Sequence, residues 1–90
     1  MIKKQGIYIL QSLKNSSYYI GSTIDLTNKL HEHKDGRVKS TKNLRPLKLV
    51  FFQKYDQIKL ARRIEYKLKK LKRRDIVEKI INDGFVILGP

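Results

Sequence analysis

The chain has 90 residues, no cysteine, and 21 Lys and Arg against 8 Asp and Glu, which gives a formal net charge of +13. This length suits a single domain, and the lack of cysteine excludes disulfides, thiolate metal sites and a cysteine nucleophile. The excess of positive charge indicates a polyanionic partner, with nucleic acid the leading candidate and an anionic membrane surface the second.

Two stretches rich in Ile and Tyr open the chain and predict a β-hairpin. Residues 6–12 and 18–23 read as its strands, and the segment between them, "LKNSS", carries turn residues. Side chains alternate between the two faces of a strand. If the isoleucines of both strands point to the core, Tyr8 and Tyr19 emerge together on the opposite face. The alternative is that the two tyrosines are ordinary cross-strand packing partners.

The segment "TIDLTNKLHEHKDG" predicts a helix, because it has capping residues at its start and Gly36 at its end. Leu26 and Leu30 lie four residues apart and form its expected buried stripe. Lys29 and His33 have the same spacing, so they project from one face of the helix. That face is either part of a functional site or an exposed helix surface.

A basic loop is expected over 37–45, followed after Pro46 by a third strand, "LKLVFFQKY", with large apolar residues on both faces. From 57 to about 72 the apolar period becomes helical. The predicted stripe of this helix consists of Leu60, Ala61, Ile64, Leu68 and Leu71.

Glu65 lies at the edge of that stripe and is the only acidic residue among nine basic ones between 57 and 74. Its position favours a functional carboxylate, although an i,i+4 pair with Lys69 is a common stabilising arrangement. A last short helix is expected over 75–82, followed by a turn at Asp83-Gly84 and an apolar tail. The whole chain, 1–90, therefore reads as one α+β domain of order β-β-α-β-α-α. Its sheet is small, three-stranded and mostly antiparallel, and helices flank it.

Two triplets in the hairpin carry a family resemblance. "GIY" at 6–8 and "YIG" at 19–21 resemble the signature triplets of the GIY-YIG nuclease superfamily. "GSTIDLTNKLHEH", "RPLKLVFFQKYD" and "LARRIEYKLKKL" extend the resemblance over about residues 4–82. The chain is most similar to the small stand-alone bacterial members that are related to the excision-repair nuclease domain.

The resemblance implies a metal-dependent endonuclease that hydrolyses DNA in repair, recombination or processing. Tyr8 and Tyr19 match the two catalytic tyrosines, His33 a catalytic helix histidine, and Glu65 the one carboxylate that holds Mg²⁺ or Mn²⁺. Lys29 stands where the family has a catalytic arginine, and lysine is a mobile point charge rather than a two-pronged donor. Nearby lysines and the metal are expected to favour the phenolate of Tyr8, which would then take a proton from the attacking water.

Contacts to single-stranded, duplex or branched DNA are expected from the basic segments, through the backbone of the nucleic acid rather than its bases. The residues predicted to make them are Gly21, Lys29, Arg37, Lys39, Lys42, Arg45 and Arg62. Two other functions stay open at this point. The first is a catalytically impaired member that only binds DNA, and the second is a non-enzymatic basic protein associated with RNA or ribosomes.

The sequence predicts no membrane-spanning segment, and nucleic acid is preferred over a membrane as the partner. The longest aliphatic and aromatic runs, such as "LVFF", are four residues long, well short of the roughly 20 that span a bilayer. The N-terminus also lacks the long apolar segment and the cleavage site of a signal peptide. We therefore expect a cytoplasmic protein.

Overall fold

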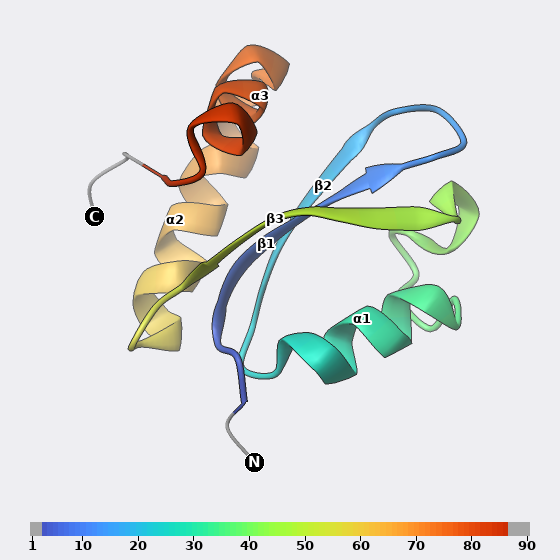
Figure 1. The fold of residues 1–90 in the computed structure, drawn as a ribbon, viewed down its shortest axis with the longest axis horizontal. Helices are drawn as coiled ribbons and strands as arrows, with labels where there is room; N and C mark the ends of the chain where they lie inside the picture. The colour runs from blue at the N-terminus through green and yellow to red at the C-terminus, as the bar shows by residue number, and fades with distance from the viewer. Residues whose placement is uncertain (1–2, 87–90) are drawn as a thin grey trace.

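The computed structural model describes residues 3–86, which form a three-stranded sheet with helices on both of its faces (Figure 1). This architecture and its β-β-α-β-α-α order confirm the α+β prediction. The strands are β1 (Gly6–Ser12), β2 (Tyr18–Thr23) and β3 (Leu47–Lys54). The helices are α1 (Leu26–Lys34), α2 (Ile58–Leu71) and α3 (Arg74–Asp83), together with a short 3-10 helix, η1 (Lys42–Leu44).

The central strand of the sheet is β1, which pairs antiparallel with both neighbours in the order β2-β1-β3. Tyr8 consequently lies opposite Gly21 on one side and Phe52 on the other. The pairing with β3 slips by one residue, because Ile9 pairs with Phe51 whereas Leu10 pairs with Leu49. A bulge of this kind changes the face to which the following side chains point.

Each face of the sheet buries its own apolar cluster. Helices α2 and α3 cover the first face, and α1 lies against the second (Figure 1). The predicted orientation of the hairpin is confirmed, because Ile7, Ile9 and Ile20 belong to the first cluster and both tyrosines to the second. Tyr8 is the most deeply buried aromatic residue of the second cluster, with only 2% of its surface exposed.

The predicted helices have the expected positions, with differences at their ends. Asp25 caps α1, and its side chain accepts a hydrogen bond from the backbone N–H of Asn28. Leu71 is wrong as a buried member of the α2 stripe, since it is 45% exposed. The reason is that the helix ends there, at Lys72 in a left-handed conformation. The basic loop also contains η1, which the sequence did not suggest.

The end of the apolar tail, residues 87–90, lies outside the described residues. Within 3–86, no helix is long and apolar enough to cross a bilayer.

Candidate active site

A chain of buried hydrogen bonds, here called the relay, links Tyr8 on β1, His33 on α1 and Thr41 in the basic loop. The Tyr8 hydroxyl lies 2.8 Å from His33 Nε2, and His33 Nδ1 lies 2.7 Å from Thr41 Oγ1. Thr41 donates its own hydroxyl hydrogen to the backbone carbonyl of Val38, at 3.5 Å. In the tautomer that carries its proton on Nδ1, His33 donates to Thr41 and its Nε2 accepts from the Tyr8 hydroxyl, which is compatible with the contact between Thr41 and Val38. This tautomer aims the basic nitrogen of His33 at Tyr8.

Both ends of the Tyr8–His33 bond are held in their neutral forms. Burial raises the pKa of Tyr8 well above its usual value, and the nearby Tyr19 and Glu65 raise it further. Burial also lowers the pKa of His33 below 6.5, and the positive charge of Lys29 acts in the same direction. The expectation that nearby lysines favour the Tyr8 phenolate is therefore wrong for this state, because desolvation dominates.

Stability should reveal this buried neutral imidazole. The unfolded chain takes up a proton on His33 near pH 6.5, whereas the folded protein does so only at lower pH. The free energy of unfolding should therefore fall as the pH drops below 6.5, by at most about 1.4 kcal/mol per pH unit. Urea unfolding between about pH 5 and pH 7 measures this.

His31 provides the matched control, because it is an exposed histidine on the same helix. His33→Gln should flatten the pH dependence, and His31→Gln should leave it in place. Equal slopes in the two variants would show that His33 titrates normally in the folded protein.

Tyr19 completes an aromatic group on the same face of the sheet. Its ring centroid lies 5.3 Å from that of His33 and 6.3 Å from that of Tyr8. Gly21 leaves room for this arrangement, since a Cβ atom at that position would collide with the ring of Tyr8. The predicted role of Gly21 in DNA contact stays a prediction, but its packing role needs no ligand.

Glu65 lies at the β2 edge of the hairpin, where helix α2 crosses it. Its Oε1 accepts a hydrogen bond from the Ser22 hydroxyl, and its Oε2 forms an ion pair with Lys69 at 2.7 Å. Lys69 Nζ also lies 5.2 Å from the centre of the Tyr19 ring. The predicted i,i+4 pair of Glu65 and Lys69 is thus present, but the same carboxylate also joins the tyrosine hairpin.

Glu65 offers the hard oxygen ligands that Mg²⁺ and Mn²⁺ prefer, but few of them. Among residues 3–86, no group of three or more His, Asp or Glu side chains lies together as a metal cage. Magnesium in phosphoryl-transfer sites is commonly bound by one or two carboxylates, substrate phosphates and water. The donor set therefore fits an ion that the substrate helps to bind, once Lys69 leaves the second oxygen.

Lys29 forms an ion pair with Glu32 at 3.2 Å, and about a third of its side chain is exposed. The positive charge of Lys29 lowers the pKa of His33, so this charge is close to the relay. A phosphate that approached Lys29 would compete with Glu32 for its ammonium group. Lysine can rotate to follow either partner.

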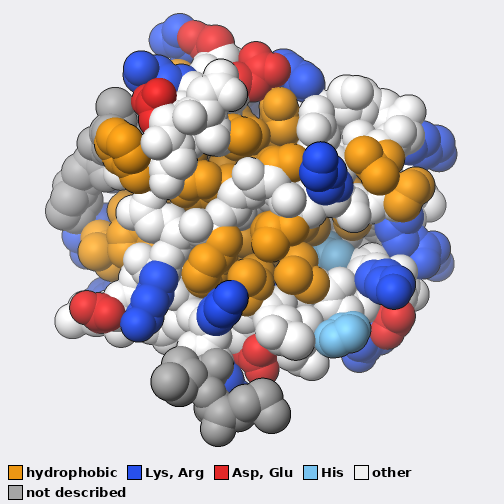
Figure 2. Space-filling model, viewed as in Figure 1, with side chains coloured by type: hydrophobic (Ala, Val, Ile, Leu, Met, Phe, Trp, Pro, Cys, Tyr) orange, Lys and Arg blue, Asp and Glu red, His pale blue; other side chains and the backbone are white. Residues whose placement is uncertain are grey.

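The remaining predicted DNA contacts are exposed and spread over the surface. Figure 2 shows Lys and Arg side chains distributed around one face, with histidine atoms among them on the α1 side. Arg37 forms an ion pair with Asp35, and Lys42 and Arg45 border a pocket beside His33. Lys39 and Arg62 are also exposed, with Arg62 on α2.

The sequence did not indicate two residues of the site, which are Thr41 in the relay and Ser22 beside the Glu65 carboxylate. Thr41 is completely buried against His33, and Ser22 bonds Glu65. Thr41 lies in an aperiodic loop and Ser22 partners a residue 43 positions away, so neither contact has a local sequence signal. The only available hint was that Ser22 follows the "YIG" triplet directly.

Comparison with known proteins places this geometry in a family context. The family model described as the GIY-YIG catalytic domain matches residues 4–80. A UPF0213 protein of Listeria welshimeri is 41% identical over 69 residues, which cover 76% of each chain. The UPF0213 protein YazA of Bacillus subtilis is 39% identical over 62 residues, or 68% of this chain and 63% of that protein. One from Syntrophus aciditrophicus is 31% identical and covers 88% of this chain and 92% of its own. No solved structure matches the chain.

Proposed function

The chain belongs to the GIY-YIG catalytic domain family, a family of nucleases, and we propose on this premise that it is a metal-dependent endonuclease that hydrolyses DNA. The observation that carries the proposal is the bond between the Tyr8 hydroxyl and His33 Nε2 beside Tyr19 and Lys29. This bond joins a phenol that can give up a proton to a ring nitrogen that can accept it. As a cellular role we propose repair, recombination or processing of DNA.

In the proposed mechanism, Tyr8 and His33 move one proton together. His33 Nε2 accepts the phenol proton while the Tyr8 oxygen takes a proton from the attacking water. The raised pKa of Tyr8 makes a free phenolate costly, so the histidine acceptor is what allows the step at neutral pH. Thr41 keeps Nδ1 protonated and thereby keeps Nε2 basic.

Tyr19, Lys29 and Glu65 serve the phosphate. The Tyr19 hydroxyl orients the water or holds the scissile group, and Lys29 balances the negative charge that grows on the phosphoryl oxygens. Glu65 would hold one divalent cation, which neutralises charge on the phosphate when it is bound. When Lys69 leaves Glu65, its ammonium group becomes free to contact a phosphate of the DNA backbone.

Cleavage of end-labelled single-stranded, duplex and branched DNA tests the proposal at low salt. We expect cutting with Mg²⁺ or Mn²⁺ and none with EDTA, and binding that weakens steeply as salt rises, because phosphate contacts release counterions. Metal-independent cutting, or a preference for RNA without any DNA cleavage, would contradict the proposal. The preferred DNA form would indicate the biological substrate.

A second candidate function is DNA binding without turnover, and Lys29 is the observation that favours it. Arginine at this position would grip a phosphate with two parallel donors, whereas lysine offers one mobile charge. Lys29→Arg should therefore raise the cleavage rate about tenfold, which corresponds to one added charge-assisted hydrogen bond.

The rates of the two proteins at saturating DNA measure this effect, with Lys59→Arg, at an exposed lysine of α2 outside the pocket beside His33, as the control. A silent wild type beside an active Lys29→Arg variant would identify a nuclease scaffold whose natural form only binds. Equal rates would show that the lysine already meets the need of the site.

A further inference from the structure

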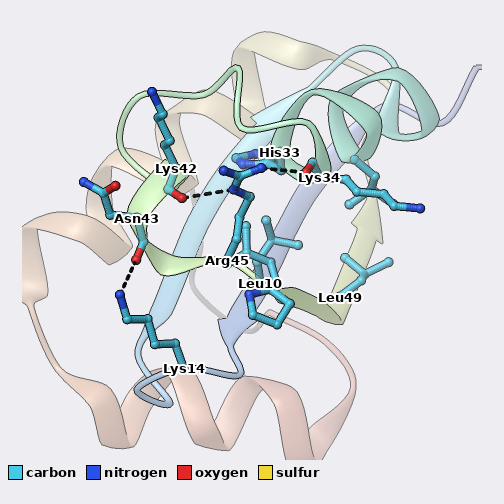
Figure 3. Close-up of a pocket in the computed structure, with 11 residues that line it drawn as sticks. Leu10, Lys14, His33, Lys34, Lys42, Asn43, Arg45 and Leu49 are labelled. Atoms are coloured by element: carbon cyan, nitrogen blue, oxygen red, sulfur yellow. Dashed lines mark hydrogen bonds between the residues drawn. The ribbon is translucent and has the colours of Figure 1, made fainter.

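A pocket of about 710 Å³ opens beside the relay, between α1, η1 and β3 (Figure 3). This volume lies within the range of about 300 to 1,000 Å³ that is typical of small-ligand sites. His33 contributes to its wall, so the pocket and the proposed active site share one residue. Nothing in the proposed hydrolysis mechanism uses the rest of it.

The pocket combines an apolar floor with a cationic rim. Lys14, Lys34, Lys42 and Arg45 line it, and none of its lining residues within the described chain is Asp or Glu. Four positive charges with no lining acid favour an anionic ligand. An anion alone, however, does not explain the leucines and the proline that form the floor.

Leu49 belongs to that floor because of the β3 bulge. The slip in register pairs Leu10 with Leu49 and so brings Leu49 to the α1 face of the sheet, beside Pro46. Leu49 remains 38% exposed there, although contact between a large apolar side chain and water is unfavourable. A bulge that re-aims a side chain next to an active site is a common functional device.

Arg45 is a preorganised cation rather than a flexible surface arginine. Its Nε donates to the carbonyl of Lys42 at 3.0 Å, and its Nη1 donates to the carbonyl of Lys34 at 3.2 Å (Figure 3). Gly36 makes space for the group, since a Cβ atom there would lie 2.7 Å from the guanidinium carbon. Both acceptors are neutral carbonyls, so the charge of Arg45 remains available to a ligand.

We propose that this pocket binds one unstacked nucleotide of the substrate strand, with its phosphate at the cationic rim and its base on the apolar floor. A nucleotide joins an anionic phosphate to a flat ring with apolar faces, and it is small enough for a pocket of this volume. Asn43 adds an amide that can pair with a base edge. The proposal rests on the proposed function, since it places the strand that approaches Tyr8.

Binding of deoxythymidine 5′-monophosphate, thymidine and inorganic phosphate tests the pocket without any cleavage step. Amide NMR spectra should show shifts at Asn43 and Leu49 with the monophosphate, and weaker ones with thymidine or phosphate alone. Equal shifts with phosphate alone would reduce the site to an anion site and overturn the nucleotide assignment. Absence of shifts around the pocket would overturn it as well.

Two pairs of variants separate the rim from the floor. Lys42→Glu should weaken binding of a single-stranded oligonucleotide and lower its salt slope by about 1 or more, whereas Lys59→Glu, an exposed lysine on α2 outside the pocket, should change both less. Leu49→Ala should weaken monophosphate binding, and Leu13→Ala, at a leucine 62% exposed outside the pocket, should not.

The outcomes distinguish this proposal from the nuclease proposal. If metal-dependent cleavage occurs but Lys42→Glu behaves like Lys59→Glu, the nuclease stands and the nucleotide pocket is wrong. If the monophosphate binds at the pocket but the wild type never cuts DNA, the pocket stands as a nucleotide site and the nuclease proposal is wrong. Thermal unfolding of every variant verifies that the fold persists.

Discussion

Tyr8→Phe is expected to lower DNA cleavage by about 100-fold to 10,000-fold, the range that a lost general base produces. The substitution keeps the ring that packs between Gly21 and Phe52 and removes only the hydroxyl that bonds His33. Without that oxygen, no group on β1 can pass a proton from water to the histidine. The initial rate of cleavage at saturating metal measures the loss.

The variant also leaves His33 Nε2 buried without its donor, which should cost about 1 to 3 kcal/mol of stability. Rates must therefore be compared at a temperature at which both proteins are folded. Tyr66→Phe is the matched control, because Tyr66 lies on α2 and is 66% exposed. If Tyr8→Phe cuts as fast as Tyr66→Phe, the tyrosine acts in packing only.

Much of this fold could be predicted because its elements carry strong local patterns. The period-two strands of the hairpin and the period of α2 set the element order and the faces of Ile9 and Ile64 correctly. The patterns did not show at which residue each helix ends and stops packing against the core. Leu71 fits the periodic stripe of α2, yet the chain turns at Lys72 before this leucine can be buried.

The site was harder to predict, because its energetics depend on contacts between distant segments. Tyr8 was expected to work at a surface, whereas α1 and the edge of β3 enclose it and raise its pKa. This reversal follows from burial, which no pairwise charge argument includes. The partners of His33 and Glu65, Thr41 and Ser22, likewise depend on how a loop and a strand end pack.

Glu65→Gln is expected to abolish metal-dependent cleavage, by at least about 1,000-fold, the scale of lost electrostatic stabilisation of a transition state. Glutamine keeps the size of the side chain and a carbonyl that can accept from the Ser22 hydroxyl. It removes the charge that Lys69 now pairs with and that a divalent cation would need. Folding should change little, because a half-exposed i,i+4 pair contributes about 0.5 kcal/mol or less.

Lys69 makes the test specific to metal binding rather than to charge in general. In the free protein Lys69 Nζ occupies Glu65 Oε2 at 2.7 Å, so a cation must displace it. Lys69→Gln should therefore strengthen Mn²⁺ binding by about twofold, the value of a pair worth about 0.5 kcal/mol, and Glu65→Gln should eliminate it. Mn²⁺ titration followed by water proton relaxation reads both effects without DNA cleavage. Unchanged Mn²⁺ affinity in both variants would mean that Glu65 is not a metal ligand and that its bonds to Ser22 and Lys69 only hold α2 against the hairpin.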